Sequence, residues 1–168
     1  LKVKKRESFR PFAPSVLRES LEEWFEHETD SPYMSFVSKV CQEKRYPINE
    51  KEEILFGIDQ LNILRSVVPA ITHVDYSARV QSISEDRNDR YYRMVKKFNE
   101  STQSPVIVNT SFNIRGEPIV CTPQDAYRCF VSTDMDILVL ENFILFKEEQ
   151  PKSTLVAKEE YLASFELD

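Results

Sequence analysis

Glycine is scarce in this sequence, with two residues in 168. Neither glycine lies in a GxxxxGK[ST] or GxGxxG pattern, so a P-loop and a dinucleotide-binding turn are both excluded. Any nucleotide would therefore be held by side chains and strand ends rather than by a glycine-rich loop.

Cysteine, histidine and long apolar runs are also scarce. The three cysteines form no CxxC pair, so we expect reduced thiols in a cytoplasmic protein rather than a disulfide framework. The two histidines form no HExxH motif, which argues against a zinc site. Glu141 and Asn142 interrupt the longest apolar run, so no membrane span is expected. The chain opens at Leu1 without a secretory signal, and we expect a domain of a longer polypeptide.

Charge is unevenly distributed along the chain. The net charge is −6, which argues against broad binding of nucleic acid. Residues 1–18 hold six basic residues and one acid, so they carry +5 and leave −11 on the rest. A local basic segment favours a small anion as ligand, and the alternative is a solvated run of terminal charge. The basic residues are Lys2, Lys4, Lys5, Arg6, Arg10 and Arg18.

The hydrophobic pattern predicts a mixed fold. Strands and helices alternate, so the expected class is α/β or α+β with a mixed sheet. Tyr91, Met94, Val95 and Phe98 are expected to face the core from one helix. Predicted strands cover 14–17, 36–40, 78–83 and the buried segment 106–108, with a hairpin at 137–140 and 143–146. Predicted helices cover 19–25, part of 42–66, 88–98, a segment capped by Thr122 and Asp125, and a weak one near 159–165.

The first polar cluster lies at the start of the chain. If this segment is extended, Lys4 and Arg6 share one face, and Arg10 continues the row. A lysine point charge beside an arginine fork suits a phosphate group.

Two further polar clusters follow predicted strands or belong to them. Arg79 and Gln81 share a strand face, and the alternative is that Arg79 pairs with Asp75 at the strand edge. The segment 109–116 carries Ser111 and Asn113, which can point into a cleft if the segment is extended. Its glycine would let the backbone approach a ligand, although an ordinary turn has the same composition.

None of these clusters contains a nucleophile–base pair or paired carboxylates. Together they form a predicted clamp for anions and amides. Such a clamp suits chemistry that depends on positioning and charge stabilisation, as phosphoryl or nucleotidyl transfer does.

Four ordered motifs connect these clusters with a known family. They resemble the C-terminal domain of the NodU/TobZ-type O-carbamoyltransferases over about residues 4–147. The resemblance implies a YrdC-like twisted open mixed sheet flanked by helices. The motifs are Lys-x-Arg-Glu-x-Phe-Arg-Pro-Phe-Ala-Pro-Ser-Val-Leu at 4–17, Thr-His-Val-Asp-x-Ser-Ala-Arg-Val-Gln at 72–81, Arg-Tyr-Tyr at 90–92 and Asn-Thr-Ser-Phe-Asn-Ile-Arg-Gly-Glu-Pro-Ile-Val-Cys-Thr-Pro-x-Asp-Ala at 109–126.

The resemblance also implies an organisation and an activity. A YrdC-like domain would cover residues 1–150, with 42–66 as a subgroup insertion, and 151–168 would be an acidic tail. The domain would join carbamoyl phosphate to ATP, with Mg²⁺ bound to the phosphates, giving carbamoyl-adenylate and pyrophosphate. A separate, metal-binding N-terminal domain would pass the carbamoyl group to a hydroxyl acceptor. The family also allows a homodimer.

Eight residues acquire binding roles from the resemblance. Phosphates or the carbamoyl group would be held by Lys4, Arg6 and Arg79, and the adenylate by Ser111 and Asn113. Arg10, Asn109 and Arg115 are further candidates.

The sequence departs from the family at two places where glycine is common, Tyr76 and the pair Gln103-Ser104. A bulky Tyr76 can reshape the turn before Arg79. Two alternative functions therefore stay open. One is a non-catalytic module that binds RNA or nucleotide, and the other is a docking domain whose site has decayed.

Overall fold

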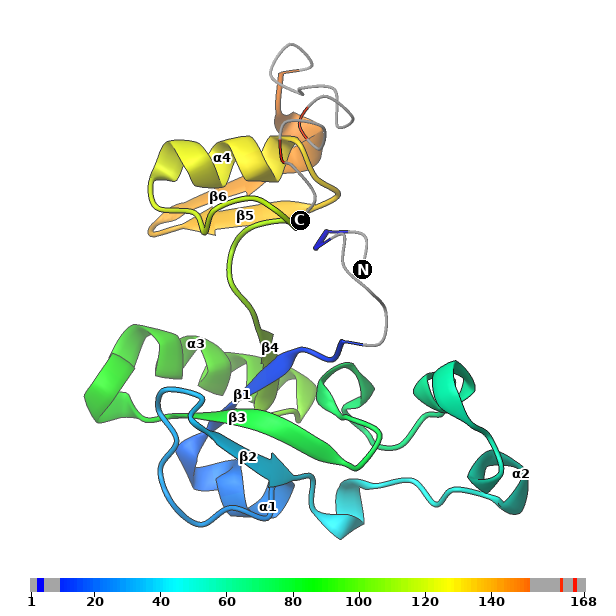
Figure 1. The fold of residues 1–168 in the computed structure, drawn as a ribbon. Coiled ribbons are helices and arrows are strands. Elements are labelled where there is room, and N and C mark those ends of the chain that lie inside the picture. The colour runs from blue at the N-terminus through cyan, green and yellow to red at the C-terminus, as the bar shows by residue number, and fades with distance from the viewer. Residues whose placement is uncertain (1–2, 5–9, 152–160, 162–164, 166–168) are drawn as a thin grey trace. The chain divides into compact units, whose positions relative to one another are not determined.

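The computed structural model describes residues 3–4, 10–151, 161 and 165. The chain divides into two compact units, each described by itself below (Figure 1). Unit 1 contains Leu1–Ser8 and Ser111–Asp168, and unit 2 contains Phe9–Thr110.

Unit 2 is built on a four-stranded mixed sheet with the strand order β2-β3-β1-β4. Strand β1 is parallel to β3 and antiparallel to β4, and β2 is antiparallel to β3. The predicted mixed sheet and α+β class are therefore confirmed. The strands are β1 Ala13–Leu17, β2 Phe36–Lys39, β3 Ser77–Ile83 and β4 Val106–Asn109.

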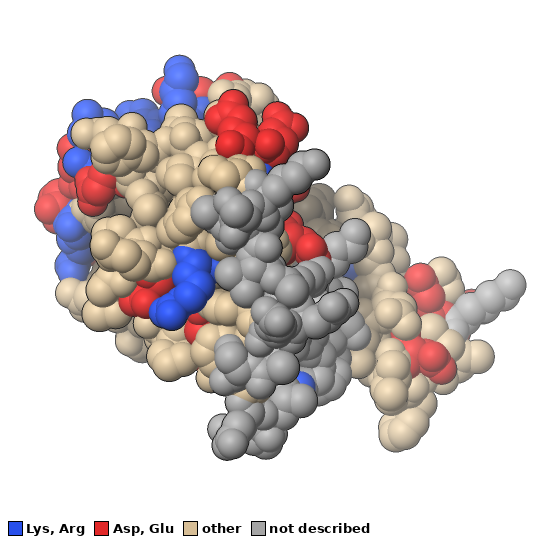
Figure 2. Space-filling view, turned by 90° about the horizontal axis from the view of Figure 1, so that it is seen from above, with Lys and Arg blue, Asp and Glu red and all other residues tan. Residues whose placement is uncertain are grey.

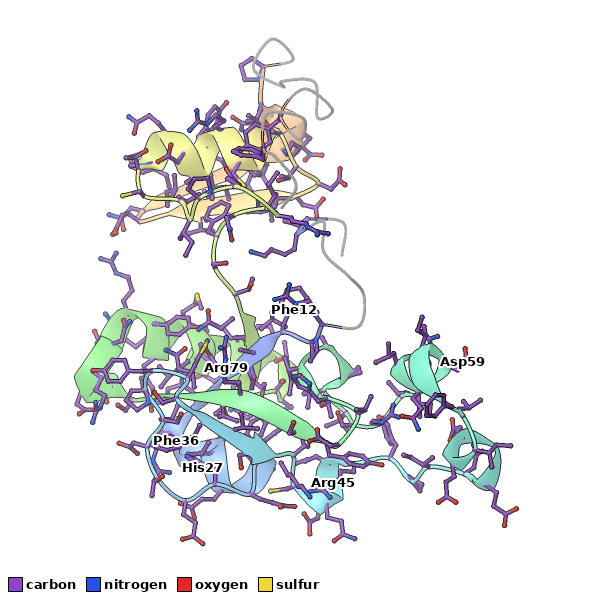
Figure 3. All side chains as sticks on the ribbon, viewed as in Figure 1. Phe12, His27, Phe36, Arg45, Asp59 and Arg79 are labelled. Carbon is purple, nitrogen blue, oxygen red and sulfur yellow. The ribbon has the colours of Figure 1, made fainter. Side chains whose placement is uncertain are left out.

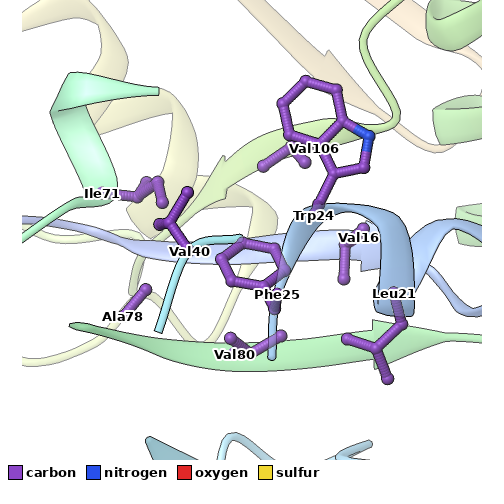
Figure 4. Close-up of a cluster of buried hydrophobic side chains, with 9 residues drawn as sticks. All are labelled: Val16, Leu21, Trp24, Phe25, Val40, Ile71, Ala78, Val80 and Val106. Carbon is purple, nitrogen blue, oxygen red and sulfur yellow. The ribbon is translucent and has the colours of Figure 1, made fainter. Parts of the chain in front are cut away.

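The two faces of this sheet bury different hydrophobic clusters, because neighbouring residues on a strand point to opposite faces. One cluster joins Val16 and Val80 to the side chains of helix α1, Leu21–Trp24, and Phe25 that follows it (Figure 4). The other joins Leu17 and Ile83 to helix α3, Glu85–Thr102. The expected apolar face on the first helix is confirmed, although its first turn, Arg18–Ser20, is a 3-10 helix.

Helix α3 exists as predicted but is longer, and its buried face differs from the expected one. Tyr92 and Val95 are buried, whereas Met94 and Phe98 are 52% and 42% exposed. The prediction that Met94 and Phe98 face inward was wrong, because the helix contacts the sheet along a narrow stripe.

Strand β4 is also less buried than expected. It lies at the edge of the sheet with β1 as its neighbour, so Val106 is buried but Val108 is 47% exposed. The prediction of a fully buried strand was wrong for Val108.

The predicted helix within 42–66 was wrong. Gly57 has a φ of +62°, which interrupts a helix, and the buried Arg65 guanidinium donates to the carbonyl oxygens of Gln60 and Ile63 at 2.6 and 3.1 Å. Its apolar residues at helical spacing are mainly exposed: Ile54, Ile58, Leu61 and Leu64. The segment instead forms the 3-10 helices Gln42–Lys44 and Gly57–Asn62 and helix α2, Glu50–Glu53.

In unit 1, helix α4 packs on a two-stranded antiparallel sheet. Thr122 and Asp125 form the predicted capping box, with Pro123 in the first turn. The predicted hairpin is confirmed, and Glu141 in its turn has a φ of +53°. These elements are α4 Pro123–Val131, β5 Ile137–Leu140 and β6 Phe143–Phe146. Among the described residues, 3-10 helices also form at Pro69–Ile71 in unit 2 and Lys147–Glu149 in unit 1.

The C-terminal segment is described at two positions. Tyr161 is buried, and its ring lies 5.1 Å from that of Phe165 in an edge-on contact. The rest of the predicted helix near 159–165 lies outside the described residues. Within the described part of the chain, no helix has the length and apolar character needed to cross a membrane.

Candidate binding sites in the two units

Lys4 lies at the centre of a polar cluster in unit 1. Its ammonium nitrogen is 2.7 Å from the Ser111 carbonyl oxygen and 3.2 Å from the Ser111 hydroxyl. It is also 2.7 Å from the Asn113 carbonyl oxygen and 2.8 Å from the Asn113 amide oxygen. We call Lys4, Ser111 and Asn113 the Lys4 cluster. The structure therefore brings three predicted site residues together, although Lys4 lies more than 100 positions from Ser111 and Asn113 in the sequence.

The Asn113 carboxamide is held at both ends. Its oxygen accepts from Lys4 and, at 2.6 Å, from the Ser111 hydroxyl, while its nitrogen donates to the Glu117 carbonyl oxygen at 2.8 Å. A lysine ammonium has three N–H donors, yet four oxygens surround this one. A ligand oxygen can therefore bind Lys4 only by replacing part of this shell.

The loop after Asn113 turns back at Gly116, whose φ is +79°. Arg115 is exposed, and its backbone N–H donates to the Lys4 carbonyl oxygen at 3.2 Å. Lys4 and this loop are thus joined through backbone atoms as well as side chains.

Glu117 is a buried residue of this loop that the sequence analysis missed. It accepts hydrogen bonds from the Ile114 backbone N–H at 2.8 Å and from the Tyr161 hydroxyl. Burial and the Glu117 carboxylate raise the pKa of Tyr161 and raise the pKa of Cys129 to about 12. The sequence carries no clear signal for this burial, because Pro118 and Ile119, which follow Glu117, are exposed.

The cysteines offer a direct test of this buried environment. Cys121 is exposed, whereas Cys129 is buried with a pKa raised from 9.0 to about 12. Because the thiolate is the reactive form, iodoacetamide at pH 8 should alkylate Cys121 and leave Cys129 unmodified in the folded protein. Because the pKa of Cys129 is higher in the folded protein than in the unfolded chain, the protonated thiol contributes to the free energy of unfolding. This contribution is complete below pH 9 and is lost as the pH rises toward 12. Peptide mass spectrometry checks both sites, with denatured protein as the control in which both react.

Unit 2 carries a second polar cluster on the α3 side of its sheet. Asn109 donates to the Ser15 hydroxyl at 3.0 Å and to the Gln81 amide oxygen at 2.6 Å, and Ser15 donates to Gln81 at 2.6 Å. Arg79, labelled in Figure 3, lies on β3. It precedes Gln81 by two residues, so the two side chains share one face of the sheet. We call Ser15, Arg79, Gln81 and Asn109 the sheet cluster.

The register of the strands explains this cluster. Ser15 pairs with Gln81, and Ala13 pairs with Asn109, so paired residues present their side chains on the same face. Gln81 and Tyr91 also line a cavity of about 230 Å³, together with Arg87. Of the sheet cluster, Gln81 therefore contacts this cavity of unit 2.

Arg79 does not pair with Asp75. The Asp75 carboxylate accepts from the Ser77 backbone N–H at 3.0 Å, and hydrogen bonds from Ser77 lower the pKa of Asp75. The exposed Arg79 has no ion pair with any residue in the described part of the chain. Its charge is thus available to a ligand, and Asp75 closes the turn before the strand.

The remaining predicted residues are distributed between the units. Arg10 is exposed in unit 2, and Arg6 lies outside the described residues. Whether these eight residues bind a substrate stays a prediction.

The two positions at which the resemblance implies glycine have left-handed backbones. Tyr76 has a φ of +65° and Gln103 a φ of +59°, a region that favours glycine. Tyr76 is held there by a backbone hydrogen bond to His73 at 3.0 Å, and its ring lies 5.0 Å from the Arg45 guanidinium. Backbone geometry thus accounts for the glycines that the resemblance implies at these two positions, and Tyr76 adds a cation–π contact with Arg45.

Replacing Gln103 with glycine should stabilise the end of α3. The left-handed conformation costs a residue with a side chain about 1–2 kcal/mol, and glycine avoids this cost. Glycine in turn loses more backbone entropy on folding, which costs about 0.5–1 kcal/mol. We expect a net gain of about 0.5–1 kcal/mol, seen as slower hydrogen exchange of the last turn of the helix. Thr102→Gly, inside the helix, is the matched control and should accelerate exchange. Faster exchange in Gln103→Gly would contradict the explanation.

Comparison with known proteins identifies the family. Residues 1–147 match the family described as Carbamoyltransferase C-terminus. The chain is 56% identical over its full length to an uncharacterized protein, sll1178, of Synechocystis. It is 38% identical over 86% of its length to nodulation protein NolNO of Sinorhizobium fredii. It is 30% identical over 70% of its length to 3'-hydroxymethylcephem-O-carbamoyltransferase of Amycolatopsis lactamdurans.

The chain spans only part of each of these relatives, namely 27%, 19% and 18% of their lengths. The family match covers most of this chain, including the Lys4 cluster and the sheet cluster. The chain therefore belongs to the carbamoyltransferase C-terminal family.

Proposed function

We propose that this domain binds ATP with Mg²⁺ and carbamoyl phosphate and forms carbamoyl-adenylate. The remainder of a longer carbamoyltransferase would then transfer the carbamoyl group to a hydroxyl acceptor. Family membership supports a transferase role. The name of the cephem O-carbamoyltransferase supports a hydroxyl oxygen as the acceptor.

The observation that carries the proposal is the Lys4 cluster. Lys4, Ser111 and Asn113 are residues to which the resemblance assigns phosphate and adenylate binding, and they are in hydrogen-bond contact. An ammonium, a hydroxyl and a carboxamide supply donors for phosphate oxygens, and the last two also supply acceptors for a ribose or a base. Their mutual contacts hold these groups together before a ligand binds.

Atom balance defines the steps that such a site has to support. Water first attacks the phosphorus of carbamoyl phosphate, the bond from phosphorus to the bridging oxygen breaks, and phosphate and carbamate form. A carbamate oxygen then attacks the α-phosphorus of ATP, the bond to the β-phosphate oxygen breaks, and pyrophosphate leaves with its electron pair. Charge builds up on phosphate oxygens in both steps, so cationic side chains lower the barrier. Lys4 in unit 1 and Arg79 in unit 2 are each proposed to contact phosphate oxygens, each within its own unit.

The proposal is tested by carbamoyl-phosphate-dependent exchange of labelled pyrophosphate into ATP. The full-length protein should catalyse this exchange only when carbamoyl phosphate or carbamate is present. Exchange that is absent under all conditions, with the protein folded, would rule out the adenylation step.

The two alternative functions have simple tests. A module that tracks RNA should lose affinity steeply with salt. In Figure 2, however, basic and acidic side chains lie beside each other on the face shown, which does not favour such a module. A decayed docking domain should give no heat with ATP and Mg²⁺ in calorimetry.

A further inference from the structure

The Glu117 carboxylate is buried, and the groups that donate hydrogen bonds to it are neutral. Glu117 is 8% exposed, and its carboxylate oxygens accept from the Ile114 backbone N–H and the Tyr161 hydroxyl. Burying a carboxylate is costly unless donors compensate it. Here a backbone amide and a phenol provide that compensation, and the thiol of Cys129 lies beside them.

Glu117 fixes the loop of the Lys4 cluster at two points. Its side chain binds the backbone N–H of Ile114, the residue directly after Asn113. Its carbonyl oxygen accepts from the Asn113 carboxamide nitrogen at 2.8 Å. Asn113 is thereby held in the orientation that turns its amide oxygen toward Lys4.

The connection from the buried core to Lys4 is continuous. It passes from the Tyr161 hydroxyl through Glu117 to Asn113 and from there to the Lys4 ammonium. Tyr161 is itself 6% exposed, so the anchored end of this connection is well packed. Because Tyr161 is packed in the core, the hydrogen-bonded network that starts from it can hold the polar side chains of Ser111 and Asn113 in a fixed position.

We propose that Glu117 is a positioning residue that fixes Ser111 and Asn113 and, through them, the direction of the Lys4 ammonium. The catalytic meaning of this role depends on the proposed adenylation function. The geometric role does not, because it concerns Lys4 in the protein without substrate.

The test combines amine labelling with steady-state kinetics on the full-length protein. Acetic anhydride labels free amines, and tandem mass spectrometry gives the rate at Lys4 relative to the exposed Lys39. Lys4 should react at least fivefold more slowly than Lys39 in the unaltered protein. Glu117→Ala should bring the labelling rates of Lys4 and Lys39 within twofold of each other. Glu117→Gln should raise the Lys4 rate less, because one acceptor oxygen is retained. Tyr161→Phe should give a Lys4 rate between those of the unaltered protein and Glu117→Ala.

Kinetics separate positioning from a general loss of structure. In the pyrophosphate exchange assay, Glu117→Gln and Tyr161→Phe should raise the KM for ATP about tenfold, with a smaller change in kcat. Glu100→Gln, on the exposed face of α3, is the control and should change neither constant. Tyr161→Phe retains the ring and removes only the hydroxyl, so it tests the connection even if Glu117→Ala does not fold.

The outcomes distinguish the two proposals. If Lys4 labelling in Glu117→Gln and Tyr161→Phe equals that of the unaltered protein, the positioning role is wrong. If the labelling rates change as expected but the unaltered protein shows no pyrophosphate exchange, Glu117 positions Lys4 and the adenylation proposal is wrong.

Discussion

Replacing Lys4 with alanine should reduce carbamoyl-phosphate-dependent pyrophosphate exchange by about 100–1,000-fold, the usual effect of removing a donor that stabilises charge in the transition state. The ammonium is the only charged group of the Lys4 cluster, so Ser111 and Asn113 cannot replace it. Lys4→Arg should not restore activity, because a planar guanidinium does not fit four oxygens arranged around one nitrogen. Initial rates of label incorporation into ATP measure the effect.

The matched control for Lys4 is Lys97→Ala. Lys97 is exposed on α3 and pairs with Glu100 at 2.8 Å, so its removal should leave the exchange rate unchanged. Ser111→Ala should cost less than Lys4→Ala, since a neutral donor contributes less than a charged one. An exchange rate in Lys4→Ala within threefold of the unaltered protein would remove Lys4 from the site.

Replacing Arg79 with alanine should reduce exchange by about 100-fold, as expected for the loss of a charged contact to phosphate. In the described part of the chain Arg79 forms no ion pair, so its charge is not consumed by a carboxylate. Its neighbours on the same face, Gln81 and Asn109, are bonded to each other at 2.6 Å and should stay in place. Kinetics with varied ATP and varied carbamoyl phosphate measure which KM changes.

The fold should tolerate this replacement, because exposed substitutions usually change stability by less than about 0.5 kcal/mol. Arg79→Lys should retain part of the activity, as it keeps the charge and loses the fork. Arg93→Ala is the control, since Arg93 is exposed and pairs with Asp89 at 2.7 Å. An unchanged KM for both substrates in Arg79→Ala would contradict a binding role.

The elements that sequence could predict are those whose local pattern agrees with their packing. Alternating residues on β3 and the Thr122–Asp125 capping box each specify their structure within a few residues. The segment 42–66 could not be predicted in this way. Its apolar spacing is helical, but the bonds that shape it come from Arg65, whose burial depends on tertiary contacts.

The site shows the same division between local and tertiary information. The residue types of Lys4, Ser111 and Asn113 indicate anion binding from the sequence alone, and the three side chains are in contact. Glu117 and Tyr161 could not be found by the same reasoning, because an acid and a tail residue are normally solvated. Their roles follow from tertiary packing, which buries both side chains and joins them by a hydrogen bond.

The most direct test of the central claim follows an oxygen atom rather than a rate. Carbamoyl phosphate labelled with ¹⁸O at both its carbonyl oxygen and its bridging oxygen is supplied to the full-length protein with ATP, Mg²⁺ and a hydroxyl acceptor. If carbamate attacks the α-phosphorus, transfer of the carbamoyl group leaves its bridging oxygen on AMP, which then gains 2 mass units. We predict that the AMP formed carries one ¹⁸O atom. Carbamoylated acceptor formed with unlabelled AMP, or without any AMP, would contradict carbamoyl-adenylate as the intermediate.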